Sequence, residues 1–261
     1  CGSPVNGCQL KVLDMCAAPG SKSTQLGSWL LSQKPMGILV ANEPDPMRAT
    51  KLEASLLRMG VTNAIVTCED GRSLGDLAPE SFDAILADVP CSCEGNARKD
   101  VTSLLTAAGT RREGPALHKE ELVDRQRAIL QSAWRALKPG GYLVYSTCTF
   151  DYWENEGQCQ RFLAELSSAE HPPIPINVFQ RLGLPVTGIA VSVGAAKGAQ
   201  ILPHTFDVEV FFVSCFRKGT EAASISCTGD ADGQEGVKDL IKHFNLKLLS
   251  DKESQEIQAL A

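Results

Sequence analysis

Short runs of β-branched and other apolar residues alternate with stretches of helical spacing along most of the chain. This alternation is typical of a parallel sheet covered by helices on both faces. Five strands are expected at 11–16, 37–43, 64–70, 82–89 and 141–147. Helices are expected at 21–31, 45–59, 119–137 and 153–166, and two antiparallel strands at 201–206 and 208–217. The sequence thus predicts an α/β fold with a mostly parallel central sheet, helices on both faces and an antiparallel C-terminal edge.

The alternation of strands and helices ends near residue 218. Residues 219–235 are rich in Gly, Ser, Thr and acidic residues, which is typical of a linker. The stretch that follows has helical apolar spacing. We therefore expect one α/β domain over 1–218, a linker over 219–235 and a helical appendage over 236–261. Because the chain begins at Cys1 without an initiator Met, we also expect it to be a fragment of a longer protein.

The net charge of −6 is not typical of a nucleic-acid-binding protein. If the chain acts on a nucleic acid, a local basic patch or a further domain has to supply most of the phosphate contacts. No apolar run approaches the roughly 18 residues that cross a bilayer, which argues against a membrane protein.

Ten cysteines are many for a chain of 261 residues. No secretory signal precedes them, so we expect reduced thiols in an intracellular, reducing compartment. Cys91 and Cys93 are separated by one residue, whereas zinc ligands are usually separated by two to four. We therefore predict no metal site.

The first expected strand carries Asp14 and leads through a turn with one glycine into a helix, as in nucleotide-binding α/β sheets. One glycine, instead of three, disfavours a dinucleotide. Acidic residues at strand ends often cap helices or lie in solvent, but four of them at one edge of a sheet favour a binding site. An anionic rim suits a cationic sulfonium and repels a polyphosphate. The four are Asp14, Glu43, Asp70 and Asp88.

Lys22 lies at the start of the helix that follows this turn, where a cation opposes the helix dipole. We expect it to pair with a carboxylate, either of a cofactor or of the protein.

Cys91 and Cys148 each follow an expected strand, within the motifs DVPC and YSTC. A buried core thiol is the commoner role for either one alone. Two thiols on adjacent strand ends beside Asp88 instead favour catalysis. A thiolate that adds to carbon 6 of cytosine makes carbon 5 nucleophilic toward a methyl sulfonium, and a carboxylic acid stabilises the charge that develops. Spacing does not decide which of the two thiols attacks.

Four motifs resemble those of the Nop/Sun family of RNA cytosine-C5 methyltransferases. They are LDMCAAPGSKST at 13–24, DGR at 70–72, DVPCSCEGNARKD at 88–100 and YSTCTFDYWENE at 145–156. The likeness covers residues 10–218 and is similar to bacterial ribosomal-RNA and eukaryotic transfer-RNA members. The resemblance implies a Rossmann-like fold that uses S-adenosyl-L-methionine, and an RNA substrate that is either rRNA or tRNA.

The resemblance also implies roles for single residues. Cys148 is the nucleophile, Cys91 assists product release as the base that removes the carbon 5 proton, and Asp88 holds the target base. The backbone of the glycine-containing turn and three carboxylates hold the cofactor. These cofactor residues are Cys16, Ala17, Ala18, Pro19, Gly20, Ser21, Lys22, Glu43, Asp70 and Asp88.

The chain departs from the family pattern at several positions. Cys93 and Val210 stand where members usually have Gly, and we expect Cys93 only to fill space. The tryptophan common in the family is absent from 101–115. Arg98 and Lys99 follow the active loop. Exposed basic residues are usually solvated, but here we expect both to contact a phosphate of the RNA.

Two other functions compete with this interpretation. One is an amino-methyltransferase with the same sheet, but such enzymes typically carry Asn/Asp-Pro-Pro-aromatic where DVPC lies and do not need Cys148. The other is a noncatalytic scaffold that binds RNA or proteins, against which the presence of both Cys91 and Cys148 argues.

Overall fold

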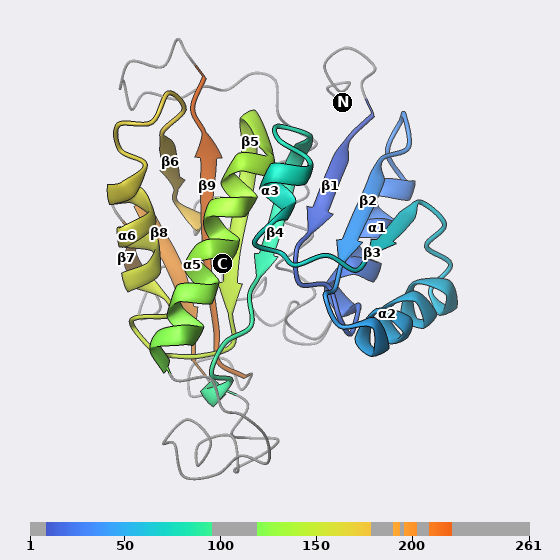
Figure 1. Ribbon diagram of the computed structural model, residues 1–261, viewed down its shortest axis with the longest axis horizontal. Helices are drawn as coiled ribbons and strands as arrows, with labels where there is room; N and C mark the ends of the chain where they lie inside the picture. The colour runs from blue at the N-terminus through green and yellow to red at the C-terminus, as the bar shows by residue number, and fades with distance from the viewer. Residues whose placement is uncertain (1–8, 96–118, 179–189, 194–195, 203–208, 221–261) are drawn as a thin grey trace, which may run out of the picture.

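The computed structural model describes residues 9–95, 119–178, 190–193, 196–202 and 209–220 (Figure 1). Helices flank a sheet of nine strands. The strands are β1 (Lys11–Asp14), β2 (Ile38–Asn42), β3 (Ala64–Thr67), β4 (Phe82–Asp88), β5 (Leu137–Thr147), β6 (Pro173–Ile176), β7 (Ala190–Val193), β8 (Ala196–Ile201) and β9 (Phe211–Lys218). The helices are α1 (Ser21–Leu31), α2 (Pro46–Arg58), α3 (Leu74–Leu77), α5 (Lys119–Ala136) and α6 (Glu156–Glu165).

The strand order is β3-β2-β1-β4-β5-β9-β8-β7, and β6 also pairs with β9. The first five strands in this order are parallel, whereas β9, β8 and β7 are antiparallel to their neighbours. The order β3-β2-β1-β4-β5 is that of Rossmann-like folds, in which ligands bind outside the carboxyl ends of the strands. The predicted mixed α/β sheet with an antiparallel C-terminal edge is therefore confirmed.

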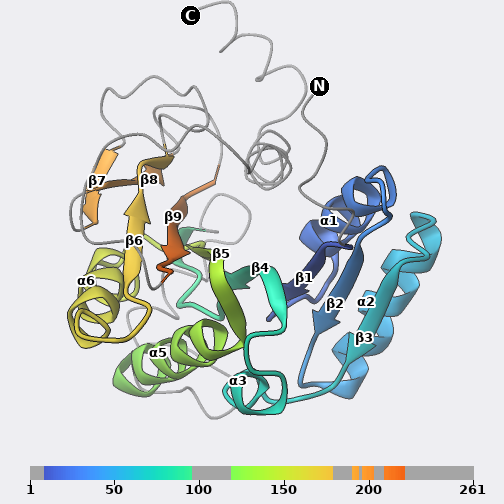
Figure 2. The ribbon, with the colours of Figure 1, turned by 90° about the horizontal axis from the view of Figure 1, so that it is seen from above.

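Helices cover both faces of the sheet, as Figure 2 shows from above. Alternate residues of each buried strand point to opposite faces. Val12 of β1 and Leu86 of β4 belong to the core beneath α1 and α2, whereas Leu13 and Ile85 belong to the core beneath α3, α5 and α6. Both cores are built from fully buried side chains, so the strands are fixed from both sides.

The first two helices begin where the sequence predicts. α1 spans Ser21–Leu31, as predicted, and α2 begins at Pro46, one residue after the predicted start. The Asp45 side chain accepts a hydrogen bond from the Arg48 backbone N–H at 3.0 Å, so Asp45 is the N-cap of α2 and not its first residue. Pro at the first helical position lacks only an N–H that would have no partner in the helix.

Several predicted strands are too long at their carboxyl ends. β1 ends at Asp14 and β3 at Thr67, because the chain turns away into the loops that carry the predicted cofactor residues. Strand β5 is instead longer than predicted at its amino end: it begins at Leu137 and not at residue 141. Pairing with β4 shifts between Phe82 and Ala84, where the Lys138–Gly141 segment bulges out and Gly140 has a φ of 80°. The proline-glycine segment thus ends α5 but lies inside the strand.

Three predicted boundaries in the C-terminal half differ from the structure. Strand β8 spans Ala196–Ile201, so of the strand predicted at 201–206 only residue 201 lies in it, and residues 203–206 lie outside the described ranges. The next strand begins at Phe211, not residue 208, and Ala199 pairs with Val213 and Ile201 with Phe211. Helix α6 begins at Glu156 and not residue 153, because the residues just before it bond to β5: the Glu154 carbonyl accepts the Tyr145 hydroxyl and the Asn155 side chain accepts the Thr147 hydroxyl.

Some predictions fall on residues that the structure does not describe. They are Arg98 and Lys99, the loop at 101–115, most of the linker at 219–235 and the whole appendage at 236–261. Within the described ranges, no helix has the length and apolar character to cross a bilayer.

Strand β1 ends in a carboxylate that is almost fully buried. Asp14 is 1% exposed, and its Oδ2 accepts a hydrogen bond from the Ser23 hydroxyl at 2.6 Å. Burial raises the pKa of Asp14 from 3.8 to about 6, although the Ser23 hydrogen bond and the Lys22 charge oppose this rise. The start of α1 is thereby tied to the end of β1 through a group that resists ionisation.

This burial predicts a pH dependence of folding stability. Because the pKa of Asp14 is about 6 in the folded protein and 3.8 as its ordinary value, the folded state binds more protons between these pH values. Stability should therefore fall as pH rises through this window, by up to about 3 kcal/mol. Asp14→Asn removes this titration. The free energy of unfolding in urea of the variant, relative to that of the wild type, should therefore increase as the pH rises from about 4 to 6. Ser23→Ala should extend the loss to higher pH. A difference between Asp14→Asn and wild type that is constant with pH would contradict this assignment.

Candidate active site

The carboxyl ends of β1, β2, β4 and β5 meet at one edge of the sheet. Asp14 pairs in register with Ala41 on one side and with Leu86 on the other, and Asp88 pairs with Ser146. Because these strands are parallel, the loops that follow them emerge side by side. The structure therefore brings the predicted cofactor loop and both predicted catalytic cysteines to the same edge.

The segment Cys16–Lys22 forms the turn from β1 into α1. The Ala17 backbone N–H donates to the Asn42 carbonyl at 2.8 Å, which holds the turn against β2. Gly20 has a φ of 109°, and a Cβ there would lie 3.0 Å from Leu52 Cδ1 and 3.1 Å from Ser55 Cβ. Both the backbone conformation and the approach of α2 therefore require glycine at this position.

Glu43 follows β2 and is only 1% exposed. Its Oε1 accepts the Asp45 backbone N–H at 3.1 Å, and its Oε2 lies 3.3 Å from Arg48 Nη2. Arg48 also donates to the Ala18 carbonyl at 3.2 Å, so it links Glu43 to the cofactor loop. Sequence reasoning missed Arg48, although it lies in the first turn of α2, where a cation opposes the helix dipole. The same signal identified Lys22.

Asn42 is a second residue that sequence reasoning missed. It is completely buried, and its Nδ2 donates to the Met15 carbonyl at 3.2 Å and the Glu69 carbonyl at 2.9 Å. Its Oδ1 accepts from the Thr67 hydroxyl and the Glu69 backbone N–H. Asn42 thus joins the loops after β1 and β3. Only its place beside Glu43 at a strand end marked it in the sequence.

Asp70 lies three residues beyond the end of β3 and not at the strand end. Its side chain is 49% exposed and forms an ion pair with Arg72 at 2.5 Å. Hydrogen bonds from the Arg72 side chain lower the pKa of Asp70 below its ordinary value, so the group stays ionised. The loop also approaches β1, because Gly71 lies against the Met15 carbonyl. Asp70 is therefore an exposed anion beside the predicted cofactor loop.

Lys22 pairs with Asp88, which confirms that it binds a carboxylate. Lys22 Nζ lies 2.6 Å from Asp88 Oδ2, and Ser146 Oγ donates to Asp88 Oδ1 at 2.7 Å. Burial alone would lower the pKa of Lys22, but the charge and hydrogen bond of Asp88 outweigh it and raise the pKa. The Asp88 carboxylate is thus held between α1 and β5.

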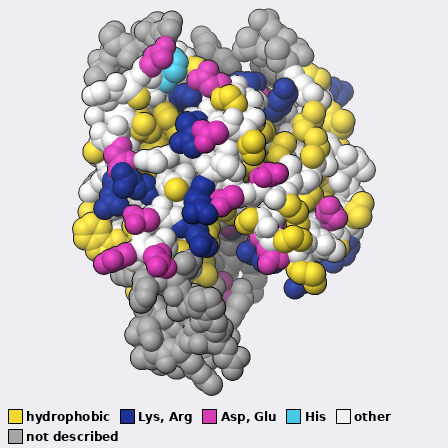
Figure 3. All heavy atoms as spheres, in the orientation of Figure 1, with side chains coloured by type: hydrophobic (Ala, Val, Ile, Leu, Met, Phe, Trp, Pro, Cys, Tyr) yellow, Lys and Arg dark blue, Asp and Glu magenta, His cyan; other side chains and the backbone are white. Residues whose placement is uncertain are grey.

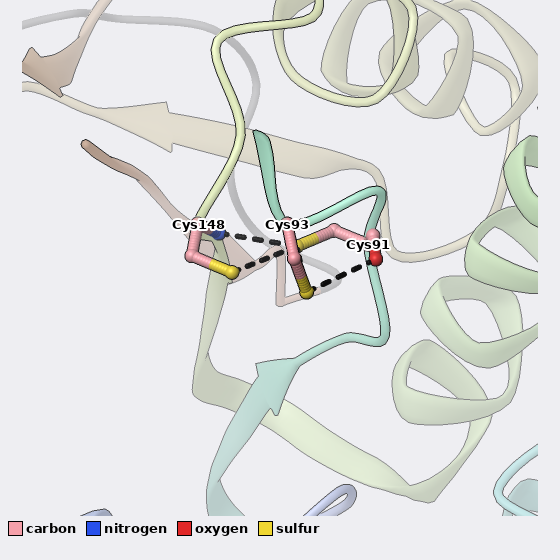
Figure 4. A group of neighbouring side chains, drawn as sticks. All are labelled: Cys91, Cys93 and Cys148. Carbon is pink, nitrogen blue, oxygen red and sulfur yellow. Dashed lines mark hydrogen bonds between the residues drawn. The ribbon is translucent and has the colours of Figure 1, made fainter. Parts of the chain in front are cut away.

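The thiols of Cys91 and Cys148 are in contact. Their sulfurs lie 3.1 Å apart, and the Cys148 backbone N–H points to Cys91 Sγ at 3.3 Å (Figure 4). Cys91 is 8% exposed, whereas Cys148 is half-buried. For Cys148, the hydrogen bond with Cys91 opposes the rise in pKa, but contact with Cys93 and burial prevail and raise the pKa to about 12. Hydrogen bonds with both neighbouring thiols and burial raise the pKa of Cys91 still further. Both thiols are therefore protonated at rest.

Cys93 is a third member of this cluster, a contact that the expectation of a space-filling side chain did not include. Its φ is 58°, a conformation that glycine adopts without strain. Its thiol donates to the Cys91 carbonyl at 3.3 Å and lies 3.9 Å from Cys91 Sγ. The three sulfurs all lie within 4.8 Å of one another.

A buried polar network holds the two cysteine loops together. Glu154 is completely buried, and its Oε2 accepts the Ser92 backbone N–H at 2.9 Å and the Gln126 amide at 2.7 Å. Gln126 also donates to the Pro90 carbonyl, and the Tyr145 hydroxyl donates to the Glu154 carbonyl at 2.6 Å. The Asn155 Oδ1 accepts a hydrogen bond from the Thr147 hydroxyl, and the Asn155 Nδ2 donates one to the Thr149 carbonyl. Glu154 and Asn155 lie inside the YSTCTFDYWENE motif, but no local pattern in the sequence indicates this role.

Comparison with known proteins shows to which family this chain belongs. A family model for the 16S rRNA methyltransferase RsmB/F matches residues 3–217. A ribosomal RNA small subunit methyltransferase F from Shewanella denitrificans is 38% identical over 209 residues, which are 80% of this chain and 38% of that protein. The protein of the same name from Aliivibrio fischeri is 36% identical over 247 residues, 95% of this chain and 46% of that protein. The chain therefore spans less than half the length of either relative.

Solved structures share the fold. NSun6 from Pyrococcus horikoshii, crystallised with SFG, has a TM-score of 0.63 and 29% identity over 80% of this chain and 48% of that one. A methyltransferase homolog protein from the same organism has a TM-score of 0.57 and 25% identity over 83% of this chain and 62% of that one. These likenesses confirm the Rossmann-like methyltransferase fold, and the family match covers most of the chain. The chain belongs to the RsmB/F family of 16S rRNA methyltransferases.

Proposed function

We propose that this chain is the catalytic part of an enzyme that methylates carbon 5 of cytosine in ribosomal RNA, with S-adenosyl-L-methionine as methyl donor and a covalent cysteine adduct as intermediate. The observation that carries this proposal is the contact between Cys91 and Cys148 at 3.1 Å, beside Asp88, at the ends of adjacent parallel strands. Family membership and the names of the relatives favour ribosomal RNA over transfer RNA as the substrate.

The cofactor site is assigned to the segment Cys16–Lys22 together with Glu43, Asp70 and Asp88. These carboxylates suit the hydroxyl and amine donors of an adenosine and the positive charge of a sulfonium. NSun6 was crystallised with SFG, an analogue of S-adenosylmethionine, which supports S-adenosylmethionine as the cofactor here. When bound, S-adenosylmethionine supplies an electrophilic methyl group.

Cys148 is the better candidate for the nucleophile because its thiol is the more accessible of the two. The attacking sulfur has to reach carbon 6 of a cytosine, and Cys91 is 8% exposed whereas Cys148 is half-buried. Addition forms the sulfur–carbon bond as the thiol loses its proton and the ring nitrogen gains one. We assign this proton transfer, and the holding of the base, to Asp88. Lys22 and Ser146 fix the orientation of its carboxylate.

Cys91 is assigned to the second half of the reaction. After carbon 5 has taken the methyl group, a base removes the carbon 5 proton, the ring double bond re-forms and the bond to Cys148 breaks. To act as this base, the Cys91 thiol first releases its own proton to solvent. When the sulfur–carbon bond breaks, Cys148 leaves as a thiolate and the ring nitrogen returns its proton to Asp88. The reverse assignment of the two cysteines is the alternative that experiment has to exclude.

The face of the protein drawn in Figure 3 gives little electrostatic attraction for RNA. On the face in Figure 3, Lys and Arg side chains are interspersed with Asp and Glu. We therefore propose that Arg98, Lys99 and parts of the protein beyond this chain supply most phosphate contacts. An amino-methyltransferase is a weaker alternative, because it gives no role to two thiols in contact. A noncatalytic scaffold gives none either.

Covalent trapping tests the nucleophile. RNA that contains 5-azacytidine should form an adduct that survives denaturation with the wild-type protein, because nitrogen at position 5 carries no proton to eliminate. Cys148→Ala should form none, as seen by electrophoresis of labelled RNA. Cys68→Ser, an exposed thiol outside the site, is the matched control and should form as much adduct as the wild type. An adduct that persists in Cys148→Ala and vanishes in a Cys91 variant would reverse the assignment.

Cys91→Ala should behave differently on unmodified RNA. Because elimination lacks its base, the variant should accumulate a covalent complex and lose turnover by roughly 100-fold or more, the usual contribution of a general base. Single-turnover kinetics with labelled methyl donor separate the two steps. Normal turnover by Cys91→Ala would rule out the release role.

Asp70→Ala should weaken binding of S-adenosylmethionine. Loss of a hydrogen bond to a charged group costs about 1.5–3 kcal/mol, or roughly 10- to 150-fold in Kd. Calorimetry on the protein without RNA measures this directly. Arg72→Ala breaks the same ion pair but leaves the carboxylate, so it should bind the cofactor far better than Asp70→Ala. Equal losses in the two variants would mean that the ion pair, and not a contact of Asp70 with the cofactor, matters.

A further inference from the structure

The third thiol in the active site has no role in the proposed reaction. Cys91 and Cys93 lie on the segment after β4, and Cys148 follows β5, yet the three side chains converge (Figure 4). The Cys91–Cys148 and Cys91–Cys93 sulfur distances are 3.1 and 3.9 Å. Three cysteine sulfurs within 4.8 Å form a donor set that soft cations prefer.

The geometry is close to that of a zinc site. A Zn–S bond of about 2.3 Å in tetrahedral geometry separates two sulfurs by about 3.8 Å. The Cys91–Cys93 distance of 3.9 Å already matches this value. The Cys91–Cys148 pair has to open by about 0.7 Å, which a small rotation of the half-buried Cys148 side chain provides. The spacing of Cys91 and Cys93 argued against zinc because it is too short for a pair of ligands in a zinc finger, and Cys148 was assigned to catalysis alone.

The backbone around the three thiols is already fixed. The Gly95 backbone N–H donates to the Cys148 carbonyl at 3.0 Å, and the Ser92 hydroxyl donates to Thr149 at 2.9 Å. The Glu154 carboxylate accepts a hydrogen bond from the Ser92 backbone N–H. The left-handed conformation of Cys93 turns its thiol back toward Cys91. A cation therefore needs no rearrangement of the loops to meet three sulfurs.

We propose that Cys91, Cys93 and Cys148 bind a thiophilic divalent cation of the Zn²⁺ class, which occupies both catalytic thiols and reversibly blocks methyl transfer. Each sulfur–metal bond replaces an S–H bond, and the three protons pass to solvent. Three thiolates and Zn²⁺ leave one net negative charge on the site. Three protein ligands leave a fourth position for water, as in zinc sites that exchange their ligands. The blocking role rests on the proposed function, whereas metal binding does not.

Metal titration of the protein without RNA or cofactor tests the binding step. After reduction with a phosphine that does not bind zinc, calorimetry should show one Zn²⁺ per chain. Co²⁺ in its place should show sulfur-to-metal charge-transfer absorption. Cys93→Gly suits the backbone conformation and removes one ligand, so it should weaken binding by at least about 100-fold, the upper range for changes around a metal site. Cys68→Ser should bind Zn²⁺ as the wild type does.

Zn²⁺ affinity that is equal in Cys93→Gly and the wild type would overturn the proposal. Cys93→Ser, which keeps the size of the side chain, repeats the comparison if Cys93→Gly does not fold. The Zn²⁺-binding experiment can fail while covalent trapping by Cys148 succeeds, so the two proposals are tested separately.

The inhibitory role is tested by methyl transfer at increasing Zn²⁺. Wild-type activity should fall as the site fills and return on addition of a chelator, whereas Cys93→Gly should need roughly 100-fold more Zn²⁺ for the same loss. Equal sensitivity of the two proteins would show that Cys93 takes no part and contradict the proposal. Unfolding on chelation, seen by circular dichroism, would make the ion structural and also contradict it.

Discussion

The parallel pairing of β4 with β5 is the contact on which the site depends. Asp88 lies opposite Ser146 in this ladder, so the two loops that follow leave the sheet side by side. Cys91 and Cys148 lie 57 positions apart in the sequence, and the pairing of β4 with β5 is what brings them together. Both faces of the pair are buried, beneath α1 and α2 on one side and α5 and α6 on the other. A slip of one residue would reverse which side chains face each core, so packing fixes the register and hence the position of the thiols.

The sequence predicts the fold where local signals and long-range pairing agree. Helix α1 has its predicted bounds because a glycine turn precedes an apolar spacing of period 3.6, and α2 has both an N-cap and a proline. Strand β8 was misplaced because its residues, Ala196–Ile201, include Lys197 and Gly198, which are poor strand formers. Its position is set by pairing with β9, a contact that the local sequence does not contain.

The same division applies to the candidate site. Residues at strand ends were found because a parallel sheet brings them to one edge, and Lys22 was found because it opposes a helix dipole. Glu154 and Gln126 were not found from the sequence, because a glutamate and a glutamine among polar residues are usually exposed on the surface. They are buried only because the loops after β4 and β5 pack against α5. Their burial is stabilised by mutual hydrogen bonds, since a buried polar group without a partner costs about 1–3 kcal/mol.

Cys93 shows how a single backbone angle changes the interpretation of a residue. A side chain other than glycine in the left-handed region costs about 1–2 kcal/mol. The hydrogen bond from its thiol to the Cys91 carbonyl, at 3.3 Å, is a weak one, because S–H is a poor donor. A bond of this kind contributes little toward the strain that glycine would avoid. A bond to a metal ion is stronger than any of these contacts, and it would give the cysteine side chain an energetic advantage over glycine at this position.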